Sequence, residues 1–433
     1  MKTGPDPTSS RRPNTPSEDA QAILLLCSTL ALPRSSGELT PLSRSEWNEV
    51  ARAIGASRFA SPAALLGATA EQLRHELKID PALADRMSAL LERGGQLTIE
   101  RSRLENLGIW ILTRVDEGYP RRLKDRLKGQ APPVLFGAGV QSGLNATGLA
   151  VVGSRDVDEA GAAFARLLGE RCAAEGLAVF SGAARGVDQL AVNACVEHGG
   201  TAVAVLAESL ERTLKHREIG RSILDGRLTV VTPFHPAAGF TAAGAMTRNK
   251  LIYALASWAV VVSSALDSGG TWAGATENLR AGWVPLFVRS GPGVPAGNAE
   301  LIARGAIPLN PDDVTRGLRG VFDGRPAATA ALEPTSPVRE DSPPYPAAPR
   351  SSSPGEIDDA FTLAWPRLAA FLATPRTEDE VSETFALERA QANEWLERAV
   401  RDGLAERTTD PVQYRAVARA AATPQRTLFD GID

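Results

Sequence analysis

Short apolar runs alternate with helical segments from Leu149 to about Leu309, and this alternation limits the possible folds more than any other feature of the chain. The runs are short, unbroken and rich in branched residues, as expected for parallel strands that are covered on both faces. Helices that alternate with such strands predict an α/β fold with a doubly wound sheet. The predicted strands are 149–152, 177–180, 201–206, 228–232, 258–264 and 284–288.

The segments around this sheet differ from it in composition. Residues 1–18 are polar and rich in Pro and Ser, which predicts disorder. Residues 19–100 have helical periodicity and few strand signals, which predicts a small helical domain of the SAM or helix-hairpin type. Its predicted helices are 20–32, 44–54, 70–77 and 82–91. Residues 326–357 contain many Pro, Ser and Ala and are predicted to form a linker.

The segment after this linker is compact again. Residues 358–418 are predicted to form a winged helix, with helices at 360–373, 378–385 and 388–402 followed by two short strands. Residues 360–420 carry eight Arg and ten acidic residues. A winged helix that reads DNA is usually basic, so we expect this one to contact protein or to regulate the chain itself. Residues 419–433 are predicted to be a flexible tail.

Two glycine-rich loops follow neighbouring strands of the predicted sheet. The first is Gly153-Ser-Arg155 and the second is Ser181-Gly-Ala-Ala-Arg-Gly-Val-Asp188. Glycines let backbone N–H groups approach a ligand closely, and a helix start adds free N–H donors and a partial positive charge. An arginine in each loop adds a planar fork that suits phosphate oxygens. The pair of loops predicts a phosphate cradle; the alternative is that each glycine serves only a tight turn.

Two further elements are predicted at the same edge of the sheet. Thr247-Arg-Asn-Lys250 is expected to open a helix over 251–256, where cations oppose the helix dipole unless an anion is present. The alternative is that the two cations pair with surface acids. Asp267-Ser-Gly-Gly-Thr-Trp272 follows a strand and precedes a helix, so its hydroxyl and glycine N–H groups are predicted to form another anion nest.

Taken together, these motifs resemble the DNA-processing protein A (DprA/Smf) family. The resemblance lies in the order Val-Gly-Ser-Arg, Ser-Gly-x-Ala-Arg-Gly-x-Asp, Arg-Asn-Lys and Ser-Gly-Gly-Thr. The stretches Thr113–Pro120 and Pro132–Phe136 are similar to that family's entry into its Rossmann-like domain. The resemblance covers roughly residues 100–310 and implies an extended Rossmann-like domain over 101–325.

The resemblance implies a single-stranded DNA-binding protein without catalytic activity. It implies loading of the RecA recombinase during natural transformation (competence) and DNA recombination, and self-association as a homodimer. Carried over residue by residue, it assigns the contacts with DNA phosphates to Gly153, Ser154, Arg155, Ser181, Gly182, Arg185, Gly186, Arg248, Asn249, Lys250, Ser268, Gly269, Gly270 and Thr271.

Several departures mark the chain as a divergent member of that family. Val192 stands where the family commonly has a histidine, and no Tyr-Pro follows the third strand near Ser209–Arg212. The third motif reads Arg-Asn-Lys, and Thr271–Ala275 is bulkier than the family's segment. These departures weaken the expectation of RecA loading more than that of a phosphate pocket.

No catalytic set accompanies the cradle, so we predict that the chain is not an enzyme. The candidate acids are Asp188, Glu208, Asp267 and Glu277, and Asp188 is expected to cap its helix. The histidines and cysteines show no metal spacing, and no complete G-x-G-x-x-G is present, so neither metal nor cofactor is expected. The alternative is a sensor or hydrolase of nucleotide-derived small molecules on the same scaffold.

Composition limits how nucleic acid could bind. The net charge is −4, so a nucleic-acid site must be a local patch. Aromatic residues make up only 5% of the chain, so binding would rest on phosphates and depend strongly on salt. Trp272 and Phe234 lie near the predicted pocket, and the alternative for Trp272 is a place in the core. No apolar run is long enough to span a membrane and no signal peptide is recognised, which predicts a cytoplasmic protein.

The last residues carry one more motif. The spacing Gln425-x-x-Leu428-Phe429 resembles the peptide by which bacterial replication and repair proteins bind the DNA sliding clamp. The alternative is a frayed tail with two chance apolar residues. A third interpretation of the whole chain is an adaptor that works through the winged helix and this tail.

Overall fold

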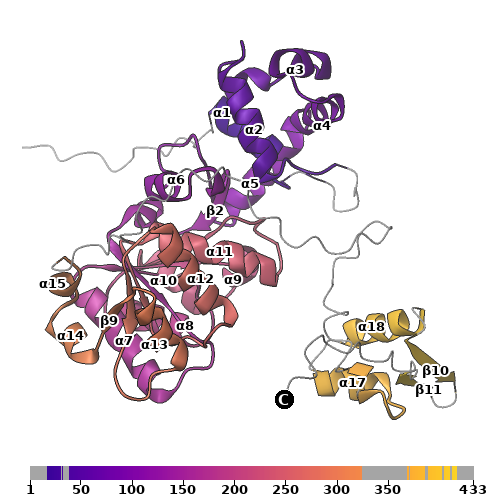
Figure 1. Ribbon diagram of the computed structural model, residues 1–433. Coiled ribbons are helices and arrows are strands. Elements are labelled where there is room, and N and C mark those ends of the chain that lie inside the picture. The colour runs from indigo at the N-terminus through magenta and orange to yellow at the C-terminus, as the bar shows by residue number, and fades with distance from the viewer. Residues whose placement is uncertain are drawn as a thin grey trace, which may run out of the picture. The chain divides into compact units, whose positions relative to one another are not determined.

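The computed structural model describes residues 17–30, 32, 39–323, 368–369, 371–385, 389–401, 404–409 and 412–416. They divide into two compact units, one within residues 1–333 and one within 334–433 (Figure 1). The segment 1–16, the predicted linker 326–357 and the predicted tail 419–433 lie outside the described residues.

A nine-stranded sheet forms the centre of the first unit, in the order β1-β2-β6-β5-β4-β3-β7-β8-β9 (Figure 1). All neighbours from β6 to β9 pair in parallel, whereas β2 pairs antiparallel with both β1 and β6. The strands are β1 Trp110–Thr113, β2 Val134–Ala138, β3 Gly148–Val152, β4 Ala178–Ser181, β5 Ala202–Val205, β6 Leu228–Thr232, β7 Trp258–Val261, β8 Leu286–Arg289 and β9 Ile307–Leu309. The predicted doubly wound α/β fold is confirmed, and the six predicted strands correspond to β3–β8.

Helices cover both faces of this sheet. In β3, Leu149 and Val151 share a core with α7 and α8, whereas Ala150 and Val152 share a second core with α11 and α12. Side chains of a strand point alternately to its two faces, so both faces are apolar and the strand reads as an unbroken apolar run. The helices are α6 Arg121–Leu127, α7 Glu159–Ala174, α8 Val187–Glu197, α9 Leu210–Thr213, α10 Arg217–Leu224, α11 Ala242–Leu255, α12 Gly269–Ala281, α13 Ala296–Ala303, α14 Pro311–Arg316 and α15 Leu318–Asp323.

In the described residues before the sheet there are five α-helices. They are α1 Glu18–Cys27, α2 Arg44–Gly55, α3 Ala70–Leu77, α4 Pro81–Leu91 and α5 Gly94–Asn106. Local signals place their starts: Ser43 with Glu46, and Thr69 with Gln72, form reciprocal capping boxes at α2 and α3. The first predicted helix ends earlier than expected, at Cys27, and α5 was not predicted because two glycines open it.

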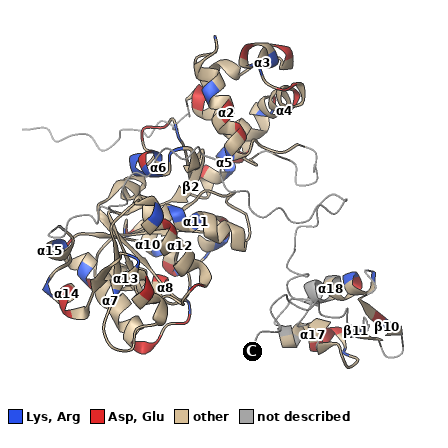
Figure 2. Ribbon diagram, in the orientation of Figure 1, with Lys and Arg blue, Asp and Glu red and all other residues tan. Residues whose placement is uncertain are grey.

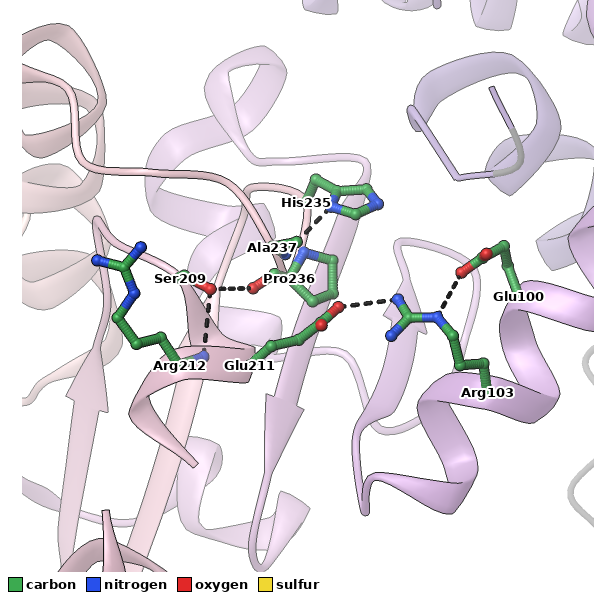
Figure 3. Close-up of polar contacts among 8 residues, drawn as sticks. All are labelled: Glu100, Arg103, Ser209, Glu211, Arg212, His235, Pro236 and Ala237. Carbon is green, nitrogen blue, oxygen red and sulfur yellow. Dashed lines mark hydrogen bonds and ion pairs between the residues drawn. The ribbon is translucent and has the colours of Figure 1, made fainter. Parts of the chain in front are cut away.

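A polar bridge joins α5 to the sheet domain (Figure 3). The Arg103 guanidinium on α5 donates to the Glu211 carboxylate on α9 over 2.8 Å. The backbone N–H of Glu211 and the Ser209 hydroxyl both donate to the carbonyl of Pro236, over 3.0 and 3.1 Å. Ser209 also caps α9 by accepting from the N–H of Arg212. The short helix α9 therefore occupies the place where the sequence lacks a Tyr-Pro, and it anchors the loop that leads into α11.

The second unit is small. It contains α17 Glu378–Phe385, α18 Arg389–Arg401 and an antiparallel hairpin of β10 Ala405–Thr409 and β11 Val412–Ala416. Leu372, Val381, Leu396 and Tyr414 form its core. Most of the helix predicted at 360–373 lies outside the described residues, so the winged helix stays a prediction.

Candidate phosphate-binding site

The topological switch point of the sheet lies between β3 and β7, which are neighbours in space but not in sequence. From β3 the chain continues to one side, through β4, and from β7 it continues to the other, through β8. Loops that leave such a pair of strands diverge and open a crevice at their carboxyl ends. Here the two loops stay joined at their base, because the N–H of Ser154 donates to the carbonyl of Ser263 over 2.9 Å.

The glycine-rich loop before α8 interlocks with the loop after β3. The N–H of Val187 donates to the carbonyl of Ser154 over 3.3 Å, and the N–H of Gln189 donates to the carbonyl of Ala184 over 3.1 Å. Gly186 has a φ of +90°, and a Cβ there would overlap the Ser154 carbonyl oxygen. Glycine is therefore required for the contact, and two N–H groups in the first turn of α8 are satisfied by the chain itself.

The carboxylate of Asp188 lies where this glycine-rich loop could otherwise bind an external anion. Its carboxylate accepts from the N–H of Gly182 over 3.0 Å and lies 3.9 Å from the guanidinium of Arg248. Both side chains are buried. Burial raises the pKa of Asp188 to about 6, although the Arg248 charge and the Gly182 N–H lower it. The prediction that Asp188 caps α8 is wrong: the helix begins after Gly186, and Asp188 faces the loop and Arg248 instead.

The start of α12 is open by contrast. Among the described residues, no side chain caps its first turn, and the hydroxyl of Ser268 makes no capping bond. Ser268, Gly269 and Gly270 are exposed. Asn249 holds this turn from α11 by donating its amide to the carbonyl of Gly270 over 3.2 Å. The uncapped N–H groups and the positive end of the helix dipole form a site that favours an anion.

Two adjoining cavities lie between these elements. The larger, of about 510 Å³, is lined by the loop after β3, by α11 and by the open start of α12. The smaller, of about 420 Å³, is lined by Arg185 and Glu208 among others. Arg155, Ala184, Phe240 and Arg248 line both. The two cavities therefore share a wall and form one composite site.

A third cavity, of about 610 Å³, lies between α1, α5 and β1. Its charged lining residues are Arg101 against Glu105, Asp116 and Glu117. This excess of acidic groups disfavours phosphate, so the composite site at the switch point is the better candidate.

The basic residues at the composite site are not equivalent. Arg155 and Arg185 are exposed, and neither forms an ion pair within the described part of the chain. Arg248 is buried against Asp188. Lys250 forms an ion pair with Glu277 at 2.8 Å and donates a hydrogen bond to the side-chain amide oxygen of Gln130 over 3.1 Å. Lys and Arg are mixed with Asp and Glu along the helices of this unit (Figure 2).

Comparisons with known proteins agree with the fold and the motifs. Residues 110–318 match the family model described as DNA recombination-mediator protein A. Protein Smf of Escherichia coli (strain K12) is 30% identical over 182 residues, which cover 40% of this chain and 48% of that protein. The chain therefore spans about half the length of the curated relative that it matches.

Residues 110–318 of the chain match the DNA-processing protein A family.

Two solved structures are similar to parts of this chain. The structure of DNA processing protein A from Streptococcus pneumoniae is 21% identical, covers 64% of this chain and 98% of its own, and has a TM-score of 0.48. The Helicobacter pylori protein of the same name, described with its single-stranded DNA binding mode, is 20% identical, covers 48% and 93%, and has a TM-score of 0.40. The description of the matching family model names a recombination mediator.

The structure brings most of the family's motif residues together. Those that line the composite site are Gly153, Ser154, Arg155, Gly182, Arg185, Arg248, Asn249, Ser268, Gly269, Gly270 and Thr271. Ser181, Gly186 and Lys250 line neither cavity. Ser181 is buried and its hydroxyl donates to the carbonyl of Val151 over 2.7 Å, so it braces the sheet edge and does not face a ligand.

The third motif does not open a helix, contrary to the prediction from the sequence. Arg248 to Lys250 lie in the middle of α11, which begins at Ala242 after the cap residue Thr241. The alanine- and glycine-containing stretch before Thr247 therefore forms helix, and the dipole argument for an anion at this point fails. Both cations face acids, Arg248 facing Asp188 and Lys250 facing Glu277. The alternative named surface acids, whereas Asp188 is buried.

Sequence reasoning missed the exposed aromatic residue at the site, Phe240. Phe240 lines both cavities, and it precedes the cap residue of α11. The two aromatics that the sequence favoured do not offer a free face: Trp272 is buried under Arg304, and Phe234 is partly buried against the first turn of α11 near Gly244. The sequence analysis gave no signal for Phe240, because it placed the start of this helix at Thr247 and not at Ala242.

The remaining acidic candidates do not converge on one point. Asp267 pairs with Arg304 at 3.8 Å, and Glu277 pairs with Lys250. Glu208 lines the smaller cavity. Among the described residues, no group of three or more His, Cys, Asp or Glu is placed to hold a metal ion. No helix in the described part of the chain is long and apolar enough to cross a membrane.

Proposed function

We propose that the chain binds single-stranded DNA at the composite site and acts in DNA processing without catalysing a reaction. The observation that carries this proposal is the open first turn of α12, which shares the larger cavity with Arg155. Backbone N–H groups at a helix start and guanidinium forks are donors well suited to phosphate oxygens. Contacts of this kind position a backbone and do not read its bases, so the binding is expected to tolerate any sequence.

The shape of the site favours a single strand over a duplex. Two adjoining cavities share a wall at Arg155 and Arg248, so they can accept neighbouring parts of one flexible strand. A duplex carries its phosphates on a stiff helix, and it cannot lower successive phosphates into two concave sites without deformation.

A salt titration tests the proposal. Fluorescence anisotropy with labelled oligo-dT measures affinity for the wild type, Arg155→Ala and Arg185→Ala, with Arg58→Ala as the matched control because its side chain is 91% exposed on the helical part. Each site variant should bind more weakly and reduce the slope of log affinity against log salt by about 0.7. The control should keep both values. Absence of binding at low salt would overturn the proposal, and saturation by one mononucleotide would favour the sensor or hydrolase alternative.

We further propose that the chain delivers its strand to RecA in natural transformation or recombination, as a homodimer in the cytoplasm. The family assignment supports this role. RecA-dependent ATP hydrolysis on single strands coated with single-strand-binding protein should increase when the chain is added, and no increase would remove the mediator role. Light scattering should give the mass of a dimer.

The sliding clamp is a separate proposed partner. The residues Gln425, Leu428 and Phe429 lie outside the described residues, and their spacing alone supports the proposal. A 420–433 peptide should bind the clamp, and a Leu428→Ala, Phe429→Ala peptide should not. Equal behaviour of the two peptides would remove this partner.

A further inference from the structure

The outer edge of β1 is one end of the nine-stranded sheet, and among the described residues no further strand pairs with it. The N–H of Arg114 donates toward β2, to the carbonyl of Pro133 over 3.1 Å, whereas the N–H of Thr113 donates away from β2, to the carboxylate of Asp116 over 2.6 Å. Backbone groups of successive residues in an antiparallel strand point to opposite sides. The N–H and carbonyl of Ile111 therefore point to the outer edge, as those of Thr113 do.

The chain closes both ends of this edge and leaves its middle open. At one end the N–H of Ile109 donates to the carbonyl of Leu104 over 2.9 Å, and at the other the N–H of Asp116 donates to the carbonyl of Thr113 over 3.0 Å. Between them, neither backbone group of Ile111 has a partner within the part of the chain that the structure describes. Unpaired groups on a strand edge are a template for an added strand.

The cavity of about 610 Å³ runs along this open edge. Gly108 to Thr113 line it without a break, and α1 and α5 form its walls. A groove of this kind suits an extended peptide, because main-chain hydrogen bonds to the strand give the binding and the walls contact its side chains. The cavity and the unpaired groups of Ile111 therefore indicate the same ligand, a segment in strand conformation.

The charges around the cavity select the kind of segment. Glu105 and Glu117 are exposed and Asp116 is partly buried, whereas Arg101 is the basic residue of the lining and pairs with Glu105 at 3.5 Å. Negative charge thus exceeds positive charge along the edge. Opposite charges attract more strongly when they are close and partly shielded from water, so the groove favours a basic segment.

Residues 1–16 of this chain have the required charge and lie next to the groove in the sequence. They carry three basic residues, two of them Arg11 and Arg12, against a single acid. The segment joins the described chain at Ser17, which itself lines the cavity. Arg12 lies five positions before Ser17, and five extended residues span about 17 Å. Because β1 has four residues and is about 13 Å long, both arginines are within reach of its edge.

We propose that residues 8–12 dock along the outer edge of β1 as an added strand. This part of the segment lies between Pro7 and Pro13, so each of its residues keeps the N–H that a strand needs. Arg11 and Arg12 then lie near the acids of the groove. The short tether makes the contact intramolecular, so a few weak interactions are sufficient. The docked segment covers an edge that could otherwise pair with another chain.

Hydrogen exchange at the amide of Ile111 tests this docking in the full chain. Mass spectrometry with fragmentation resolves this amide. Its exchange in the wild type should be at least about tenfold slower than in a chain that lacks residues 1–16, because the added strand accepts its hydrogen bond. A chain with both Arg11→Glu and Arg12→Glu should exchange as fast as the truncated chain.

A charge reversal in the groove separates docking from a general effect of charge. Glu117→Arg added to the chain with both arginines reversed should slow the exchange again, because opposite charges then face each other. The matched control is Glu49→Arg in the same background, which reverses an exposed acid of α2 outside the cavity and should not slow it. The amides of Trp110 and Leu112 face β2 and should exchange alike in all variants, which shows that the sheet stays folded.

Equal exchange of Ile111 in the wild type and in the truncated chain would overturn the docking. Fast exchange in both would mean that the edge is open, and slow exchange in both would mean that a different segment covers it. Protection that increases with protein concentration in both would identify a second copy of the chain as the occupant. If Glu117→Arg does not slow the exchange, the placement of the two arginines beside the acids is wrong.

Discussion

The two glycine-rich helix starts of this protein look alike in sequence and differ in the structure. At α8 the loop carbonyls of Ser154 and Ala184 accept N–H bonds from the first turn, and the carboxylate of Asp188 accepts from Gly182. At α12 the first turn carries no side-chain cap, and Ser268 to Gly270 are exposed. The loop before α8 therefore already holds the carboxylate of Asp188, whereas the start of α12 is open to an anionic ligand.

This difference divides the basic residues of the site into two groups. The charge of Arg248 compensates the buried carboxylate of Asp188, so this arginine stabilises the wall of the cavity. Arg155 and Arg185 are exposed and available to a ligand. The family motif contains all three arginines, and the comparison predicts different consequences when each is removed.

The largest effect is expected for Arg248→Ala. Removing one partner of a buried ion pair leaves the other uncompensated, so the free energy of unfolding should fall by about 3 kcal/mol. Arg185→Ala removes an exposed side chain, and its change should stay within about 0.5 kcal/mol. Urea denaturation measures both. Similar losses of stability in the two variants would contradict the division between structural and ligand-facing arginines.

A smaller effect is expected when a carboxylate is introduced at the open start of α12. Ser268→Asp places a carboxylate at the start of α12, where it caps the helix and repels phosphate. The affinity for oligo-dT should fall about tenfold or more, while the free energy of unfolding rises by about 0.5–1 kcal/mol. Ser268→Ala is the control, and its stability should be that of the wild type because Ser268 makes no capping bond. A Ser268→Asp variant with unchanged DNA binding would show that the phosphate lies elsewhere.

The smallest effect is a dependence of binding on pH. Burial raises the pKa of Asp188 to about 6, so this carboxyl takes up a proton as the pH falls through about 6. A bound phosphate nearby favours the protonated form further, so binding takes up protons and the affinity should rise as the pH falls from 7.5 to 5.5, by roughly two- to fivefold.

Asp188→Asn provides the matching control for this pH effect. The amide cannot ionise, so the variant should show an almost flat profile across the same range. Affinity measurements at constant ionic strength check both proteins. A wild-type profile that is also flat would mean that Asp188 and the bound phosphate do not interact.

Local signals in the sequence were sufficient for the framework of the fold. The apolar runs that became β3 to β8 are covered on both faces, so each strand is recognisable without knowledge of its neighbours. The loops Gly153–Arg155 and Asp267–Thr271 were located for a similar reason, because a glycine between an apolar run and a helical run marks the end of a strand. The residues gathered at the switch point follow from this order.

Contacts between distant parts of the chain decided the rest. The sequence could not show that Asp188 and Arg248, sixty positions apart, would pair and close the first nest. The sequence analysis also placed Arg248 at the start of a helix, whereas α11 begins at Ala242. The alanines before Arg248 become helical because they pack against the sheet, which the sequence alone does not show. The exposure of Phe240 beside Arg155 is likewise a product of two loops meeting. The sequence by itself thus determined where the anion-binding loops lie, whereas the tertiary structure decided which of them is open, since that depends on which distant side chains the fold brings against each loop.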